Sequence, residues 1–120
     1  MIKDAKVAVV GSRKYDDYQF ISKVLNDYHK KFGISWIISG GATGVDSLAE
    51  RWAKENQIFG FSVYLPQWDQ FGKRAGPRRN LLIVENCDVM IAFPGKDSRG
   101  TRHSIGLAER LDKKVYVFDV

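Results

Sequence analysis

Short apolar runs alternate along this chain with longer segments in which apolar residues recur at every third or fourth position. The short runs are rich in Val, Ile, Phe and Tyr, which is typical of strands. They predict five strands, over residues 6–10, 35–39, 60–65, 89–93 and 114–118. Glycine-containing segments follow the first four of these runs and mark where those strands are expected to end.

The longer segments predict three amphipathic helices, because each carries its apolar residues on one face only. The apolar stripes consist of Phe20, Ile21, Val24, Leu25, Tyr28 and Phe32; of Val45, Leu48, Ala49, Trp52 and Ala53; and of Ile105, Ala108 and Leu111. A shorter helix is predicted over residues 77–86, with Pro77 in its first turn, where a missing N–H group costs nothing.

Strands that alternate with helices predict parallel pairing, right-handed crossovers and helices on both faces of the sheet. The expected fold class is therefore α/β: a single Rossmann-like three-layer α/β/α sandwich with a mainly parallel five-stranded sheet. At 120 residues the chain has the length of one domain, spanning residues 1–120. In such sheets ligands bind beyond the carboxyl ends of the strands, near the point where the strand order reverses.

The composition, with 44% hydrophobic and 28% charged residues, is that of a globular protein. No apolar run reaches the roughly 18 residues needed to cross a membrane, and the first residues lack the apolar core of a signal peptide. We therefore expect a cytoplasmic protein with no membrane partner. Cys87 is expected to be a buried apolar filler. The spacing of His29 and His103 is not that of metal ligands, so we expect neither a metal nor a cofactor.

Glycine is concentrated in four segments that each follow a predicted strand. They hold eight of the 11 glycines: Gly11, Gly40, Gly41, Gly44, Gly72, Gly76, Gly95 and Gly100. The segment 39–46, Ser-Gly-Gly-Ala-Thr-Gly-Val-Asp, leads from a strand into a helix, so backbone amides and the positive end of the helix dipole face one spot. This predicts an anion site, with a plain turn as the alternative. The candidate ligand-binding residues here are Ser39, Gly40, Gly41, Ala42 and Gly44.

Positive charge is concentrated beside the same segments. The net charge is +5, and nine of the 19 Lys and Arg residues lie in or next to three of the segments: Arg13, Lys14, Lys73, Arg74, Arg78, Arg79, Lys96, Arg99 and Arg102. An anionic partner is therefore expected. A phosphate pocket and a basic face for nucleic acid both fit this distribution, and a merely solvated basic surface is the third interpretation.

Four side chains in these segments carry specific chemistry. Arg13 can make bidentate contacts with phosphate, or it can close its own turn against a neighbouring carboxylate. Arg79 is suited to phosphate, and Asn80 either hydrogen-bonds a sugar or base edge or satisfies loop carbonyls. Asp46 lies in the first turn of its helix, where the dipole favours a carboxylate. It is either a helix cap or a functional group, as an acceptor for ribose hydroxyls or a general base in glycosidic cleavage.

The stretch 66–76 is predicted to be an irregular loop of a length that is often functional. It contains Trp68, which has no periodic apolar partners and can either stack on a base or pack the loop onto the domain. Lys73 is a further candidate ligand-binding residue in this stretch.

Four ordered motifs together resemble the YspA-like, cpYpsA-related branch of the SLOG superfamily. They are Gly-Ser-Arg at 11–13, Ser-Gly-Gly-Ala-x-Gly-Val-Asp at 39–46, Gly-Lys-x-Ala-Gly-Pro-x-Arg-Asn at 72–80, and Pro-Gly at 94–95 with Gly-Thr at 100–101. The resemblance runs from Val7 to about Leu111. It extends more distantly to the DNA-processing protein DprA (Smf) and to the lonely-guy phosphoribohydrolases.

The resemblance implies a Rossmann-like SLOG domain that binds a nucleotide or a nucleotide-derived ligand. By this resemblance the pocket is lined by Gly11, Ser12, Arg13, Ser39, Gly40, Gly41, Asp46, Arg79, Asn80, Pro94, Gly95, Gly100 and Thr101. Since lonely-guy relatives form dimers, it also implies a homodimer or a higher homo-oligomer. The DprA relationship implies single-stranded nucleic acid as a second class of partner.

The chain departs from the lonely-guy enzymes at their catalytic motif. Their Pro-Gly-Gly-x-Gly-Thr sequence is followed by glutamates, one of which acts in splitting the base from ribose phosphate, whereas Arg102, His103 and Ser104 follow here. Our leading hypothesis is a module that senses or sequesters a nucleotide or an ADP-ribose-type ligand. The alternatives are an N-glycosidase acting on nucleoside monophosphates, with Asp46 or His103 as the catalytic acid or base, and DprA-like binding of single-stranded nucleic acid.

Overall fold

The computed structural model describes residues 4–96 and 98–120. In chain order, their helices and strands are β1 (Ala5–Gly11), α1 (Tyr18–Phe32), β2 (Ile34–Ser39), α2 (Val45–Glu55), β3 (Gly60–Val63), α3 (Trp68–Phe71), a 3₁₀ helix (Gly72–Arg74), α4 (Ala75–Asn86), β4 (Val89–Phe93), α5 (Arg99–Arg110) and β5 (Lys114–Val117). The five predicted strands are confirmed, with ends that differ by two residues at most.

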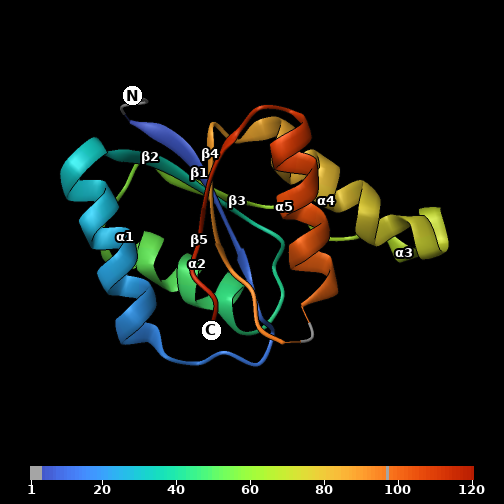
Figure 1. Cartoon of the computed structure of the whole chain (residues 1–120), viewed down its shortest axis with the longest axis horizontal. Coiled ribbons are helices and arrows are strands. Elements are labelled where there is room, and N and C mark those ends of the chain that lie inside the picture. The colour runs from blue at the N-terminus through green and yellow to red at the C-terminus, as the bar shows by residue number, and fades with distance from the viewer. Residues whose placement is uncertain (1–3, 97) are drawn as a thin grey trace.

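The strands form one parallel sheet in the order β3-β2-β1-β4-β5. The chain therefore builds outward from β1 to β3 and then returns to β4 on the other side of β1. The strand order reverses between β1 and β4, and the expected Rossmann-like α/β fold is confirmed. Figure 1 shows α1 and α2 on one side of the sheet and α4 and α5 on the other, with α3 projecting beside α4.

The two-residue period of the strands divides the core between these two faces. In β1, Val7 and Val9 are buried against α1 and α2, whereas Ala8 and Val10 are buried with residues of α4 and α5. β4 alternates in the same way, and all five of its residues are buried. A strand buried on both faces requires a continuous apolar run, which explains why the sequence pattern identified it.

The ends of α1 follow from local hydrogen bonding. The side chain of Asp17 accepts a hydrogen bond from the Phe20 amide at 3.2 Å, which satisfies one of the free donors of the first turn. Gly33, with φ of 84°, ends the helix and donates its amide to the His29 carbonyl at 2.8 Å. The chain then enters β2 directly.

The prediction of an irregular loop over residues 66–76 is wrong. This stretch contains α3, the 3₁₀ helix and the first two residues of α4, which begins two residues before Pro77. The proline still lies in the first turn of α4, where its missing N–H group is tolerated. None of the residues of α3 or of the 3₁₀ helix is fully buried, so this region lacks the apolar stripe that identified the longer helices.

Cys87 lies at the junction of α4 and β4 and is 1% exposed. Burial raises the pKa of its thiol to about 11, which suppresses the reactive thiolate. Its role is therefore packing. No helix in the described part of the chain is long and apolar enough to cross a membrane.

Candidate functional site

A cleft of about 520 Å³ lies at the carboxyl ends of β1 and β4, where the strand order reverses. This is the position at which open α/β sheets bind ligands. Its lining comes from the end of β1, from the segments after β1, β2, β4 and β5, and from α2, α4 and α5: Val10, Gly11, Ser12, Arg13, Lys14, Tyr15, Gly40, Ala42, Asp46, Arg79, Asn80, Ile83, Gly95, Lys96, Ser98, Arg99, Gly100, Thr101, Ser104 and Val120.

The turn after β1 lies at the floor of this cleft and is fixed by two backbone hydrogen bonds. The Ser12 amide donates to the Phe93 carbonyl of β4, and the Ser12 carbonyl accepts from the Val45 amide at the start of α2, each at 3.0 Å. Gly44, with φ of 74°, permits this approach, since a Cβ atom there would collide with the Ser12 carbonyl oxygen. The turn after β1 is therefore fixed to both β4 and α2.

Asp46 is a buried carboxylate, 6% exposed, on the cleft side of α2. Its Oδ2 accepts hydrogen bonds from the Gly40 amide at 3.1 Å and from the Ala42 amide at 3.3 Å. Burial raises the pKa of Asp46 to about 6, although the two amides and the nearby Arg79 charge oppose that rise. Two of the amides expected to bind phosphate are thus occupied by the protein's own carboxylate.

Arg79 is held in a fixed orientation between the ends of β2 and β3. Its Nη1 donates to the Gly40 carbonyl at 2.7 Å and to the Tyr64 carbonyl at 3.4 Å, while its Nε donates to Asn80 Oδ1 at 2.9 Å. Burial lowers the pKa of this guanidinium, and the charge of Asp46 opposes that effect. No carboxylate among the described residues lies within 4 Å of it.

The start of α5 forms the opposite wall of the cleft. Ser98 Oγ accepts from the Gly95 amide at 2.8 Å and closes the turn after β4. The Gly100 carbonyl accepts from Ser104 Oγ at 3.2 Å and from Asn80 Nδ2 at 3.4 Å, so α4 and α5 are joined beside the cleft. The first amides of a helix are free donors and carry its positive dipole end, which favours an anion at this wall.

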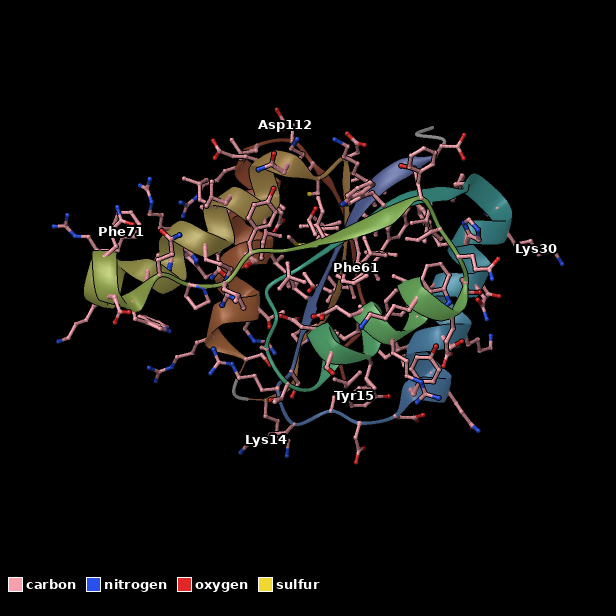
Figure 2. All side chains as sticks on the ribbon, turned by 180° about the vertical axis from the view of Figure 1, so that it is seen from behind. Lys14, Tyr15, Lys30, Phe61, Phe71 and Asp112 are labelled. Carbon is pink, nitrogen blue, oxygen red and sulfur yellow. The ribbon has the colours of Figure 1, made fainter. Side chains whose placement is uncertain are left out.

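Positive charge dominates the cleft. Among the described lining residues, five are cationic and one is a carboxylate: Arg13, Lys14, Arg79, Lys96 and Arg99 against Asp46. Figure 2 shows Lys14 and Tyr15 on the loop that follows β1. The cleft is therefore suited to an anionic ligand, with one buried acceptor at its β2 side.

Most of the predicted ligand-binding residues line this one cleft. They are Gly11, Ser12, Arg13, Gly40, Ala42, Asp46, Arg79, Asn80, Gly95, Gly100 and Thr101. Four others, Ser39, Gly41, Gly44 and Pro94, lie beneath or beside the lining. Ser39, for example, is fully buried and donates its hydroxyl to Glu50 Oε2 at 2.9 Å.

Three predicted residues lie away from the cleft. Trp68 is 54% exposed on α3 and lies near Gly76, because the stretch predicted to be a loop is helical and projects beside α4 (Figure 1). Lys73 is exposed in the 3₁₀ helix. His103 is exposed on α5, and its Nδ1 lies 3.3 Å from Asn80 Nδ2.

Several lining residues were not among the predicted ones. Ile83 follows Arg79 by four positions, and Ser104 follows Gly100 by four, so each shares a helix face with a predicted residue. Extending each motif by one helical turn would have found both. Val120 reaches the cleft because its amide donates to the Pro94 carbonyl at 3.0 Å, and no sequence signal indicates that pairing.

Fold and cleft together define a Rossmann-like protein with a mainly cationic cleft at the switch point of its parallel sheet. The chain belongs to the YspA, cpYpsA-related SLOG family, whose model matches residues 5–71. The matched part includes the segments after β1 and β2 but neither Arg79 nor α5. The chain is also 35% identical over 112 residues to the Gene 61 protein of Mycobacterium phage D29, covering 88% of this chain and 89% of that protein.

Two solved structures share the fold. DNA processing protein A (DprA) from Streptococcus pneumoniae matches with a TM-score of 0.76 and 23% identity, over 93% of this chain and 49% of that one. DprA from Helicobacter pylori, described for its single-stranded DNA binding mode, matches with a TM-score of 0.73 and 23% identity, over 96% and 65%. The chain thus spans about half of one DprA chain and about two thirds of the other.

Proposed function

We propose that this domain binds a phosphorylated nucleoside in the cleft between the ends of β1 and β4, as a sensing or sequestering module. The observation that carries the proposal is the composition of that cleft: five cations and one buried carboxylate around about 520 Å³ at the switch point of the sheet. Phosphate supplies the charge that the cations favour, and a sugar supplies hydroxyl donors for the carboxylate. Family membership supports the same class of ligand.

The phosphate is expected against the turns after β1 and β4 and the first turn of α5. Arg13, Lys14, Lys96 and Arg99 approach from this side. The amides of residues 99–101 lie in the first turn of α5 and donate no hydrogen bond to any described residue, and the first turn of a helix is a favourable place for an anion. Arg79 is orientated from the β2 side and can complete the neutralisation of the phosphate.

The sugar is expected near Asp46 and Asn80. Oδ2 of Asp46 is used by the Gly40 and Ala42 amides, whereas Oδ1 accepts no hydrogen bond from a described residue. A ribose hydroxyl is a suitable donor for Oδ1, because a buried carboxylate gains from each hydrogen bond it accepts.

A screen of thermal stability tests this proposal. At about 100 times the dissociation constant, a nucleotide stabilises the folded state by roughly 2.7 kcal/mol, on the order of 10 °C in a domain of this size. The matching unphosphorylated nucleoside should have a far smaller effect. Lys14→Ala should weaken nucleotide binding, whereas Lys30→Ala, on α1 and outside the cleft, should not. The proposal fails if mono-, di- and cyclic nucleotides all leave the melting temperature of ligand-free protein unchanged.

Glycosidic cleavage is a second candidate, supported by Asp46. A carboxyl group with a pKa near 6 can donate or accept a proton close to neutral pH. His103, the other candidate acid or base, is exposed and does not line the cleft. We expect little or no free base from nucleoside monophosphates. Base release that is sustained in long incubations and disappears in Asp46→Asn would put the glycosidase first.

Binding of single-stranded nucleic acid is the third candidate, supported by the fold shared with DprA and by the net charge of +5. Its signature is a steep fall of oligonucleotide affinity with salt, because each neutralised phosphate releases counterions. A mononucleotide occupying the cleft would show a much smaller salt dependence. Titrations of both ligands at low and high salt therefore separate the two candidates.

The proposal also includes the domain organisation, cellular location and assembly of the protein. We expect residues 1–120 to act as one SLOG domain in the cytoplasm, as a homodimer or higher homo-oligomer. Light scattering after size exclusion, with and without nucleotide, measures the assembly.

A further inference from the structure

A second cleft, of about 630 Å³, lies at the outer edge of the sheet. The segment after β3, the short helix α3 and the part of α4 up to Leu82 form its walls, with Tyr64, Leu65, Phe71, Arg78 and Leu82 among the lining residues. Arg79 lines this cleft and the first one alike. The two clefts therefore meet at one guanidinium.

The hydrogen bonds of Arg79 define that junction. Its Nη1 bridges the Gly40 carbonyl, at the end of β2, and the Tyr64 carbonyl, after β3. Since β2 lies between β1 and β3, the guanidinium is positioned along the carboxyl edge of the sheet, between the two clefts. Its Nη2 donates to no described residue. A fixed guanidinium with free donors is suited to an anionic group that connects the contents of the two clefts.

The walls of the second cleft suit a flat aromatic group. Arg78 lies over the Phe71 ring, with its guanidinium carbon 4.3 Å from the ring centroid, and Figure 2 shows Phe71 on α3. Leu65 is 64% exposed and Leu82 is 39% exposed, so apolar surface is open to solvent beside this pair. A guanidinium plane backed by an aromatic ring is a surface on which nucleobases stack.

The charge of the second cleft agrees with this occupant. Its lining contains Arg78 and Arg79 but no carboxylate, so an anionic ligand meets no repulsion there. An apolar segment of a protein partner would use the leucines but would leave both guanidinium groups without a matching group. The nucleobase of a ligand anchored in the first cleft uses the leucines and the guanidinium groups together.

We propose that the second cleft receives the second nucleobase of a ligand in which two nucleosides are joined through phosphate, with the joining phosphate at Arg79. This rests on the proposed function, because the first nucleoside occupies the first cleft. Either a dinucleotide joined by a pyrophosphate or two successive nucleotides of a single strand has this chemistry.

The test compares ligands that differ only in the second nucleoside. Isothermal titration gives the affinities of the wild-type protein for ADP, GDP, CDP and UDP, and for the four symmetrical molecules in which the same pyrophosphate carries a second copy of the nucleoside. We expect the best of the symmetrical molecules to bind about 5- to 150-fold more tightly than its diphosphate, which is the range that base stacking supplies. A second series of titrations represents a single strand and compares phosphorylated deoxynucleotide dimers with the matching monophosphates. A gain in affinity from the second nucleoside in either series supports the proposal, and the series that shows the gain tells whether a pyrophosphate-linked dinucleotide or a strand is the ligand.

Matched variants test whether the gain in affinity comes from the second cleft. Leu82→Ala and Arg78→Ala should each reduce the ratio between the two affinities several-fold. Leu81→Ala and Arg74→Ala should leave that ratio unchanged, because these residues are similarly exposed neighbours that do not line the second cleft. All four variants alter exposed side chains, so circular dichroism is expected to show folded protein in each case.

The outcomes separate this inference from the proposed function. If no diphosphate or monophosphate binds, the proposed function fails first. If diphosphates bind and neither arm shows a gain, only the second site is overturned. A gain that survives in both Leu82→Ala and Arg78→Ala would also overturn it. If these two variants lose affinity equally for the diphosphate and for the symmetrical molecule, the proposal is also overturned, since the second cleft would then hold the one base of the diphosphate.

Discussion

Replacing Asp46 by asparagine should make this protein more stable at neutral pH and remove part of the pH dependence of its stability. The carboxylate is 6% exposed, and one oxygen, Oδ2, accepts both loop amides. An asparagine side chain has the same shape as an aspartate, and its single carbonyl oxygen can accept the same two hydrogen bonds. The substitution therefore removes the buried charge while it keeps the hydrogen bonds of the loop.

The magnitude follows from the pKa of Asp46, which burial raises from an ordinary value of 3.8 to about 6. Because the folded state holds the proton more tightly than the unfolded state, folding is favoured by the protonated form. The contribution is complete below pH 3.8 and is lost as the pH rises to about 6. At about 1.4 kcal/mol for each pH unit, the loss amounts to roughly 3 kcal/mol. Above that pH it stays constant.

Urea unfolding between about pH 4 and pH 8 measures this effect, with the fluorescence of the fully buried Trp52 as reporter. The free energy of unfolding of Asp46→Asn should exceed that of the wild type by up to about 3 kcal/mol at pH 8, and the difference should shrink toward acid pH. Asp69→Asn, on the exposed helix α3, controls for the loss of one negative charge. The reasoning would be refuted if the free energy of unfolding changed with pH in the same way for the wild type and Asp46→Asn. It would also be refuted if Asp46→Asn were less stable than the wild type at pH 8.

Three further predictions rest on neighbouring contacts. Arg79→Ala should weaken nucleotide binding by about 10- to 150-fold, through the loss of a charge-assisted contact, and titration that finds equal affinities for folded variant and wild type would remove Arg79 from the site. Trp52→Ala should cost roughly 3–5 kcal/mol in urea unfolding, whereas Trp68→Ala, 54% exposed, should change stability by less than about 0.5 kcal/mol; similar losses would contradict the assigned core. Gly44→Ala should destabilise the fold by about 1–3 kcal/mol, because the φ of Gly44 is 74° and an added Cβ would collide with the Ser12 carbonyl. Gly106→Ala is the control, because a Cβ there meets no atom within 4 Å. A melting temperature that is unchanged in both variants would be inconsistent with the described turn.

The sheet and its main helices could be predicted because burial leaves a periodic record in the sequence. β4 is apolar at every position and α2 carries a one-sided stripe, and both features follow from the faces that these elements bury. The short helix α3 leaves no such record, since four residues form a single turn and none of them is fully buried. The sequence pattern therefore predicts a loop over 66–76, and it leaves open whether Trp68 stacks on a base or packs the loop onto the domain, whereas the structure has Trp68 exposed on α3.

The position of the cleft was predictable from topology, because parallel strands that alternate with helices present their carboxyl ends at one edge. The internal arrangement of the cleft was not. That Asp46 occupies the Gly40 and Ala42 amides depends on how the glycine turn folds back over α2, and Gly41 and Gly44 adopt positive φ values that only the tertiary contacts select. The pairing of Val120 with Pro94 likewise depends on β5 lying beside β4.

Asp46 also determines on which side of the first cleft the phosphate and the sugar of a ligand are favoured. A carboxylate beneath the turn after β2 repels phosphate there, while Arg13, Lys96 and Arg99 attract it toward the turns after β1 and β4. The neutral hydroxyls of a sugar are the part of a nucleotide that gains from lying beside Asp46. Asp46 therefore places the sugar on the β2 side of the first cleft and one phosphate toward the turns after β1 and β4. A further phosphate that follows the edge of the sheet toward the second cleft meets Arg79, which is bound to the Gly40 and Tyr64 carbonyls and whose positive charge offsets the repulsion by Asp46.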